Sequence, residues 1–377
     1  MTVQPEGYAP GIGYDDRAPD RIEGAIPRAI DWLRRSFFGS LGNTALTLAV
    51  LGFLFLVLPP LIRWMVTDAT ISGTTKAACA GDGACWTFIR MRLPLFFYGH
   101  YPPEQVWRVD LTGVLLAAFS VPVLRDGTRR RGFWLLMLLT AFPALAAILL
   151  VGGVLGLPFV DTTQWGGLML DVLVAFVVVA GSLPLGILLA LGRRSELIVV
   201  KTLSICFIEL WRAVPLLAVL IISALMIPLF LPEGVHIDRL IRALVGLILF
   251  NAAYMAETVR GGLQGVSMGQ EEAAYSVGMP WWQVQVFVVL PQALRHVMPG
   301  IVNNVVDLFK DTTLITIIGL FDVLGAINQA LKDPAWLGFA REGYVFTMVM
   351  FFVCCFAMST YARRMERRLN RHKTGRK

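Results

Sequence analysis

Residues 168–191 read LMLDVLVAFVVVAGSLPLGILLAL, and Asp171 is the only ionisable side chain in this run. A helix that crosses a bilayer needs about 20 mostly apolar residues, and the run meets that length. Similar apolar runs lie at 42–62, 109–124, 132–154, 213–231, 240–259, 300–320 and 343–361. They are continuous rather than alternating, which argues against a transmembrane β-barrel. We therefore predict an all-α polytopic membrane protein with about eight transmembrane helices.

The composition agrees with a membrane protein and disfavours other classes. Of 377 residues, 56% are hydrophobic and only 16% are charged, whereas a soluble domain carries about 25% charged residues. This balance excludes a disordered chain, a coiled coil and a disulfide-rich secreted domain. It also disfavours a water-soluble enzyme, because one core would have to bury all this apolar surface.

Lysine and arginine are distributed unevenly between the two sides of the predicted membrane. With a cytoplasmic N-terminus, 23 of the 33 Lys and Arg residues fall on the cytoplasmic side. This asymmetry predicts that both termini are cytoplasmic. Residues 1–40 are then a cytoplasmic arm without a cleavable signal, and the basic tail 363–377 anchors the last helix. The alternative for the tail is a nucleic-acid- or lipid-binding arm, but we expect no nucleic-acid partner.

Two cysteines share the predicted outer loop 63–108, where Cys79 and Cys85 bound the string CAGDGAC. An oxidising space outside the membrane permits a disulfide between them. The sequence does not set the geometry of the pair, so two free thiols remain the alternative. The chain has no Cys/His cluster, phosphate-binding loop or nucleophile elbow. We therefore predict no catalytic residue, no metal site and no cofactor bound by this chain.

The connection 260–299 is long for a cytoplasmic loop between two spans. Its first part is rich in helix-forming residues, and Gly278 and Pro280 are expected to end that helix. A second amphipathic piece follows, which Pro291 and Pro299 are expected to break. We predict two short helices that are joined by a glycine turn and lie parallel to the membrane. A re-entrant loop is the alternative, and four charged or titratable side chains make it costly: Glu271, Glu272, Arg295 and His296.

Within this connection, Glu272-Ala273-Ala274 is followed after three residues by Gly278 and after eleven more by Leu290-Pro291. This spacing resembles the EAA loop of ABC importer permeases. The resemblance implies that the loop docks on a cytoplasmic ATPase, which binds ATP and Mg and hydrolyses the ATP. Gly278 would supply the tight turn. The residues that would lie at the ATPase contact are Glu271, Glu272, Ala273, Ala274 and Gly278.

Three further strings resemble the polar amino acid uptake permeases: ELWRAVPL at 209–216, AYMAETVRGG at 253–262 and KDTTL at 310–314. They imply a five-span permease core at 166–362. Residues 41–165 add three spans, and their strings GACW (83–86) and YGHYPP (98–103) resemble the M-type permease subunit of the general L-amino acid importer. The importer of glutamate, glutamine, aspartate and asparagine is similarly close.

The resemblance implies a bacterial inner-membrane complex that transports amino acids. Its partners would be a second, related permease subunit, an ATPase dimer and a periplasmic amino acid-binding protein. The chain itself would not be an enzyme. A secondary amino acid transporter is the alternative, although it should show repeated halves with broken helices. A membrane scaffold or receptor would not need polar residues along a span.

Polar residues of the predicted spans are candidates for a substrate pathway. In span 300–320 they follow one helical stripe, namely Asn303, Asp307, Lys310 and Asp311. An amino acid zwitterion needs both an anionic and a cationic partner, and this stripe supplies both. The alternative is a structural Asp307–Lys310 pair. Span 240–259 adds three residues that would line the same cavity: Asn251, Tyr254 and Thr258.

Two charged pairs with i,i+3 spacing lie near span ends. The first is Glu209 with Arg212, and the second is Glu257 with Arg260. One interpretation is a pair of structural ion pairs that lock the helix ends. The other is that the pairs form a gate which opens during transport.

Overall fold

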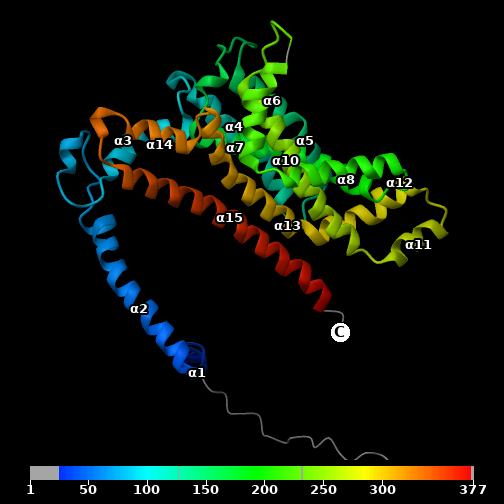
Figure 1. The fold of residues 1–377 in the computed structure, drawn as a ribbon, viewed down its shortest axis with the longest axis horizontal. Helices are drawn as coiled ribbons and strands as arrows, with labels where there is room; N and C mark the ends of the chain where they lie inside the picture. The colour runs from blue at the N-terminus through cyan, green and yellow to red at the C-terminus, as the bar shows by residue number, and fades with distance from the viewer. Residues whose placement is uncertain (1–24, 126, 231, 375–377) are drawn as a thin grey trace, which may run out of the picture. The chain divides into compact units, whose positions relative to one another are not determined.

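The structure of the protein, a computed structural model, describes residues 25–125, 127–230 and 232–374 (Figure 1). These residues form helices joined by short loops, with isolated β-bridges and no strand among them. The predicted arm 1–40 and tail 363–377 lie partly outside the described residues. The chain divides into two compact units, of which the first contains Gly81–Ala84 and the residues up to Ala69.

The first unit contains α1 (Ala25–Phe38) and α2 (Leu41–Ile62). Ser40 is the N-cap of α2, since its side chain accepts a hydrogen bond of 3.1 Å from the backbone N–H of Asn43. A π-helical turn, Arg63–Thr67, extends α2. No residue of α2 is buried against protein, as expected for a helix that faces lipid.

The second unit contains the remaining helices (Figure 1). By length and composition, six described helices can cross a membrane, or seven if one bent pair counts as a span. The number eight is therefore not confirmed. The long helices of this unit are α4 (Val106–Leu124), α5 (Arg131–Leu139) with α6 (Ala141–Val151), α7 (Gly167–Arg193), α8 (Ile198–Ala213), α10 (Arg239–Gln264), α13 (Leu290–Asp311) and α15 (Ala340–Thr374).

The second half of the bent pair, Leu216–Phe230, occupies the span that the sequence predicts at 213–231. Helix α8 precedes that range, and α9 (Leu216–Ile221) continues through a π turn and a 3₁₀ turn to Phe230. The two halves are bent by 101°. Val214 is extended, as the helical region is disfavoured for a residue that precedes a proline, here Pro215. Pro215 therefore separates α8, which the sequence analysis does not predict as a helix, from the second half of the pair.

Two predicted proline breaks are wrong. The helical run from α12 (Trp281–Gln283) passes through a π segment, Val284–Val289, into α13, and α13 contains both Pro291 and Pro299. A π segment widens the helix and relaxes its regular hydrogen bonding, which accommodates Pro291 at the next turn. Helix α13 consequently begins ten residues before the predicted span 300–320. It ends at Asp311, where the 3₁₀ turn Thr312–Ile318 follows.

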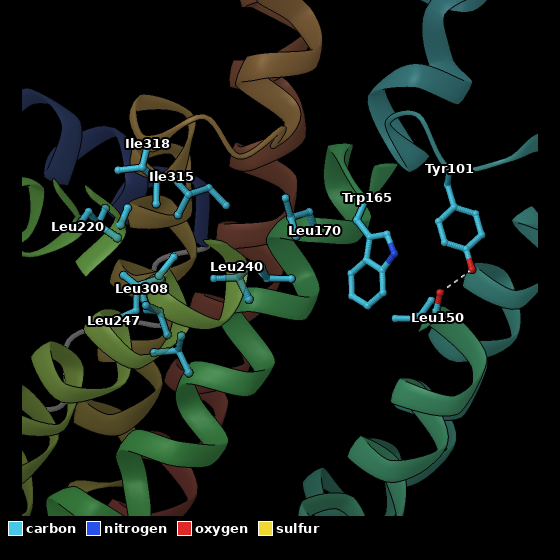
Figure 2. Close-up of a cluster of buried hydrophobic side chains, with 14 of the residues drawn as sticks. Tyr101, Leu150, Trp165, Leu170, Leu220, Leu240, Leu247, Leu308, Ile315 and Ile318 are labelled. Carbon is cyan, nitrogen blue, oxygen red and sulfur yellow. Dashed lines mark hydrogen bonds between the residues drawn. The ribbon is translucent and has the colours of Figure 1, made fainter. Parts of the chain in front are cut away.

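The core of the second unit lies around α7, α10 and α13, which pack on one another. Figure 2 shows part of it, with Leu170, Leu247 and Leu308 contributed by these three helices. Glycines permit the close approach, because a Cβ on Gly186 of α7 would lie 2.6 Å from Met255 of α10. Tyr101 joins the same cluster and donates a hydrogen bond of 3.0 Å to the carbonyl of Leu150 (Figure 2).

A second cluster connects the predicted outer loop to the end of the chain. It packs α3 (Trp86–Tyr98) against α14 (Val323–Leu331) and α15. Cys79 and Cys85 form a disulfide, with their Cα atoms 5.6 Å apart. The buried carboxylate of Glu342 in α15 accepts a hydrogen bond of 3.2 Å from the backbone N–H of Cys85. The start of α3 is thereby fixed to α15.

Candidate functional site

A cavity of about 200 Å³ lies between α9, α10 and α13. Helices α10 and α13 provide nearly all of its wall, and they pack on each other. Its polar lining consists of Asn251, Tyr254, Asn304, Asp307 and Asp311. These groups offer two carboxylates, two amides and a phenol to a molecule in the cavity. Asn251, Tyr254, Asp307 and Asp311 belong to the pathway residues that the sequence predicts.

The α13 wall differs in detail from the predicted stripe. The Lys310 ammonium lies 2.8 Å from the Asp307 carboxylate, and both side chains are more than half exposed. Asn303 and Lys310 are not among the described residues that line the cavity. Asp307 therefore lines the cavity and also forms the ion pair with Lys310.

The sequence prediction missed Asn304, which precedes Asp307 by one helical turn. Its Nδ2 donates hydrogen bonds to the Thr258 hydroxyl at 2.9 Å and, more weakly, to the Met255 sulfur at 3.7 Å. Thr258 itself does not line the cavity in the described chain, but it orients a residue that does. The spacing of Asn304, Asp307 and Asp311, at i, i+3 and i+7, is the signal that could have identified it.

Asn251 on α10 is buried and fixed by α7. Its Nδ2 donates a hydrogen bond of 2.7 Å to the hydroxyl of Ser182. This hydrogen bond fixes the orientation of the Asn251 amide, which lines the cavity. Tyr254, one turn further along α10, lies under the Arg212 guanidinium, whose carbon is 5.8 Å from the ring centroid. Tyr254 thus connects the cavity to a group of charged residues that includes Arg212.

These charged residues form one cluster rather than two separate pairs. The Glu257 carboxylate lies 2.8 Å from Arg260, 2.7 Å from Arg193 and 3.7 Å from Arg212. Glu209 does not contact Arg212 as predicted; it lies 3.2 Å from Arg193. The cluster therefore connects the ends of α7, α8 and α10.

Arg193 is the member of the cluster that the sequence prediction missed. In the sequence it is only one of the basic residues at a span end whose distribution indicates orientation. Its contacts come from residues 209 and 257, far away in sequence, so no local spacing identifies it.

The predicted glycine turn ends α11 (Met268–Ser276). Gly278 has φ +82°, and the backbone N–H groups of Gly278 and Met279 donate to the carbonyls of Tyr275 and Ala274, at 2.9 and 3.3 Å. This pair of bonds is a Schellman motif, which favours glycine at its left-handed position. The turn aims the chain from α11 into the helix that becomes α13.

Helix α11 has one face toward the bundle and one face free. Ala274 is buried beside Val259 and Leu263 of α10, and Glu271 lies 2.8 Å from Arg194 at the end of α7. Glu272 and Ala273 are exposed. Large apolar side chains nearby are exposed as well: Met268, Tyr275, Val277, Trp282 and Phe287. An exposed patch of this kind, with an acidic residue beside it, is typical of a protein interaction surface.

Comparison with known proteins places this arrangement in a family. Residues 182–371 match the family model described as "Binding-protein-dependent transport system inner membrane component". The chain is 46% identical to the inner membrane amino-acid ABC transporter permease protein YhdY of Escherichia coli, over 92% of this chain and 95% of the relative. It is 36% identical to the glutamate/glutamine/aspartate/asparagine transport system permease protein BztC of Rhodobacter capsulatus, over 91% and 94%.

Among solved structures, an amino acid ABC transporter with histidines matches 54% of this chain and 92% of its own, with 27% identity and a TM-score of 0.48. The alignments with YhdY and BztC extend over more than nine-tenths of this chain and so include most of the region before the family match. The family match spans half of the chain. The chain therefore belongs to the family of inner membrane components of binding-protein-dependent transport systems.

Proposed function

We propose that this chain is the permease subunit of an ATP-driven amino acid importer and forms half of the translocation pathway. The observation that carries the proposal is the cavity between α10 and α13, which is lined by two carboxylates, two amides and a phenol. These groups suit the ammonium and carboxylate of an amino acid. The names of YhdY and BztC support amino acids as the substrate class.

In this proposal, Asp307 and Asp311 attract the substrate ammonium. The amide oxygens of Asn251 and Asn304, whose Nδ2 groups already donate to protein acceptors, would accept further hydrogen bonds from that ammonium. The Tyr254 hydroxyl would donate to the substrate carboxylate. Charged groups in a span are costly unless they face an interior or a pathway. Lys310 balances Asp307, since their atoms are 2.8 Å apart. The side chain selectivity of transport would be set largely by the binding protein that delivers the substrate.

Coupling would begin at α11, which we propose docks on the ATPase through Glu272, Ala273 and the exposed apolar side chains beside them. Glu271 would instead transmit the movement, because it is tied to Arg194 of α7. The Glu257 cluster joins α7, α8 and α10. Since α10 carries both Glu257 and the cavity residues Asn251 and Tyr254, movement of α11 would reach the pathway.

The proposed assembly contains this chain, a related second permease, an ATPase dimer and a periplasmic binding protein. ATP and Mg would bind to the ATPase alone, and both termini of this chain would be cytoplasmic. One copy of the docking loop per chain implies that a second permease occupies the second ATPase subunit.

The test is amino acid uptake into vesicles that contain the complete complex. We expect uptake only with ATP, ATPase and binding protein. The double variant Asp307→Asn with Lys310→Met removes both charges, so no orphan charge remains, and the complex should assemble with normal basal ATPase activity. Uptake should fall about tenfold or more, the effect of losing a charge-assisted contact. The control Asn303→Ala, outside the cavity lining, should transport normally.

Two outcomes would contradict the proposal. Full uptake by the double variant would assign the pair a purely structural role. Uptake without the ATPase, driven by an ion gradient, would instead identify a secondary transporter.

A further inference from the structure

A second, larger cavity is lined only by residues that precede the family match. Its volume is about 500 Å³, and residues of α3, α4, α6 and α7 line it. This volume is within the range of about 300–1,000 Å³ that is typical of small-molecule sites. No residue of the transport cavity contributes to it. It therefore needs an explanation of its own.

The cavity is a slot that follows α4 and α7. Its lining on α4 extends from Val109 to Ala117, which corresponds to about 12 Å of helix. On α7 it extends in parallel from Leu168 to Phe176. Helices α4 and α7, and α5 together with α6, are long and apolar enough to cross a membrane, so we expect lipid chains around the slot.

Small residues on α4 leave the slot unfilled. Gly113 and Ala117, one turn apart, line it and are exposed. A Cβ added to Gly113 would meet no atom within 4 Å. Glycine within a helix costs about 1 kcal/mol relative to alanine. Since no neighbouring atom would clash with a Cβ here, packing within the protein does not explain a glycine at position 113.

The slot is polar at one end only. There the Tyr98 hydroxyl donates a hydrogen bond of 2.8 Å to the exposed carboxylate of Asp110. Burial and the neighbouring Asp110 carboxylate raise the pKa of Tyr98, so the phenol remains a donor. No cation pairs with Asp110 in the part of the chain that the structure describes. Trp107, half exposed one turn earlier on α4, belongs to the residue types that are enriched among lipid headgroups.

We propose that this slot binds one phospholipid with an ammonium headgroup, such as phosphatidylethanolamine. An acyl chain would lie along Gly113 and Ala117, and the headgroup ammonium would contact Asp110. The distribution of basic residues predicts that this end of α4 is at the outer face, so the lipid would come from the outer leaflet. The lipid would complete the packing between α4 and α7. A helix of another protein is a poorer occupant, because the single polar end is anionic and the slot is shorter than a span.

The experiment compares lipid retained by the purified full-length chain, measured by native mass spectrometry after reconstitution in vesicles of phosphatidylethanolamine and phosphatidylglycerol. Gly113→Leu fills the slot, and Ala117→Leu does so from the next turn. The matched control is Gly132→Leu on α5, where a Cβ also meets nothing within 4 Å but which lies outside the slot. We expect both slot variants to retain about tenfold less phosphatidylethanolamine than the wild type, and the control to retain it fully.

The headgroup is tested by Asp110→Asn in vesicles in which phosphatidylcholine replaces half of the phosphatidylethanolamine. The wild type should prefer the primary ammonium, which donates hydrogen bonds to the carboxylate, and the variant should lose this preference. Retention that is equal in the wild type and in both slot variants would overturn the proposal. So would loss of the second permease subunit from the Gly113→Leu complex without any change in lipid, because a protein helix would then be the occupant.

Discussion

Glu257 is a single carboxylate that holds three arginines, which come from α7, α8 and α10. Its side chain is only 17% exposed. We predict that Glu257→Gln lowers the free energy of unfolding by about 1–3 kcal/mol, because the guanidinium groups lose their common charged acceptor. Thermal unfolding of the purified protein should show a lower midpoint.

The control for Glu257 is Glu209→Gln. Glu209 has one arginine partner and is 57% exposed, so its replacement should cost at most about 1 kcal/mol. Equal destabilisation by the two variants would contradict the central position of Glu257.

Residues of the site could be predicted from the sequence when their spacing within one helix was informative. Spacing selects Asp307, Asp311, Asn251 and Tyr254, which line the cavity, but it also selects three residues that do not: Asn303, Lys310 and Thr258. Arg193 could not be found, because its partners are contributed by other helices. The local pair Glu209–Arg212 satisfied the spacing rule, yet contacts across helices separate the two residues in the structure.

At the scale of elements, the turn after α11 depends on the conformation of Gly278. Its φ of +82° is unfavourable for branched residues, although a Cβ would meet no atom within 4 Å. We predict that Gly278→Val, which adds about 1–2 kcal/mol of backbone strain, largely abolishes ATP-driven uptake while the protein still inserts. Gly278→Asn should retain most uptake, because asparagine tolerates this region. If the two variants behave alike, backbone conformation is not what the turn requires.

The outer loop offers a second test at this scale. The Cys79–Cys85 disulfide closes a short loop at the start of α3, and such a loop contributes about 2 kcal/mol in the chain-entropy model. Cys79→Ser should lower the thermal midpoint, and a reductant should lower that of the wild type but not that of the variant. Cys206→Ser removes an exposed free thiol and should leave the midpoint unchanged. A reductant effect that persists in Cys79→Ser would exclude this bond as its source.

Element boundaries were predicted well where composition changed sharply and poorly at prolines. The end of α11 at Gly278 was predicted, since a Schellman turn depends on local sequence. Pro215 bends the chain while Pro291 and Pro299 do not. Whether a proline bends the helix depends on the backbone conformation of the turns beside it. The amino-acid composition of the segment does not reveal that conformation.

At the scale of the whole molecule, the distribution of basic residues predicts the topology. We expect a membrane-impermeant thiol reagent to label Glu104→Cys in intact cells and Glu196→Cys only after permeabilisation, in a chain whose free cysteines are replaced. Both positions are exposed, so failure to react would reflect sidedness. Labelling of Glu196→Cys in intact cells would reverse the assignment.

The class of the molecule, an all-helical inner membrane permease, followed from hydropathy and a few motifs. The number of spans could not be predicted from hydropathy, because one helix pair is bent and α13 is polar. The packing of α7 on α10 also required the structure, since close contacts such as Gly186 with Met255 join residues far apart in sequence.

The polarity of α13 has a consequence for biosynthesis. This helix carries Arg295, His296, Asp307, Lys310 and Asp311 and is not among the helices apolar enough to be recognised as a span. Each charge near a bilayer centre opposes release from the translocon by about 2.5–3.5 kcal/mol. The nascent α13 should therefore enter the membrane only beside α10, which is synthesised earlier and packs on it. Insertion of this helix is then a step of tertiary folding, and a ribosome stalled before α13 would hold an intermediate that lacks one wall of the cavity.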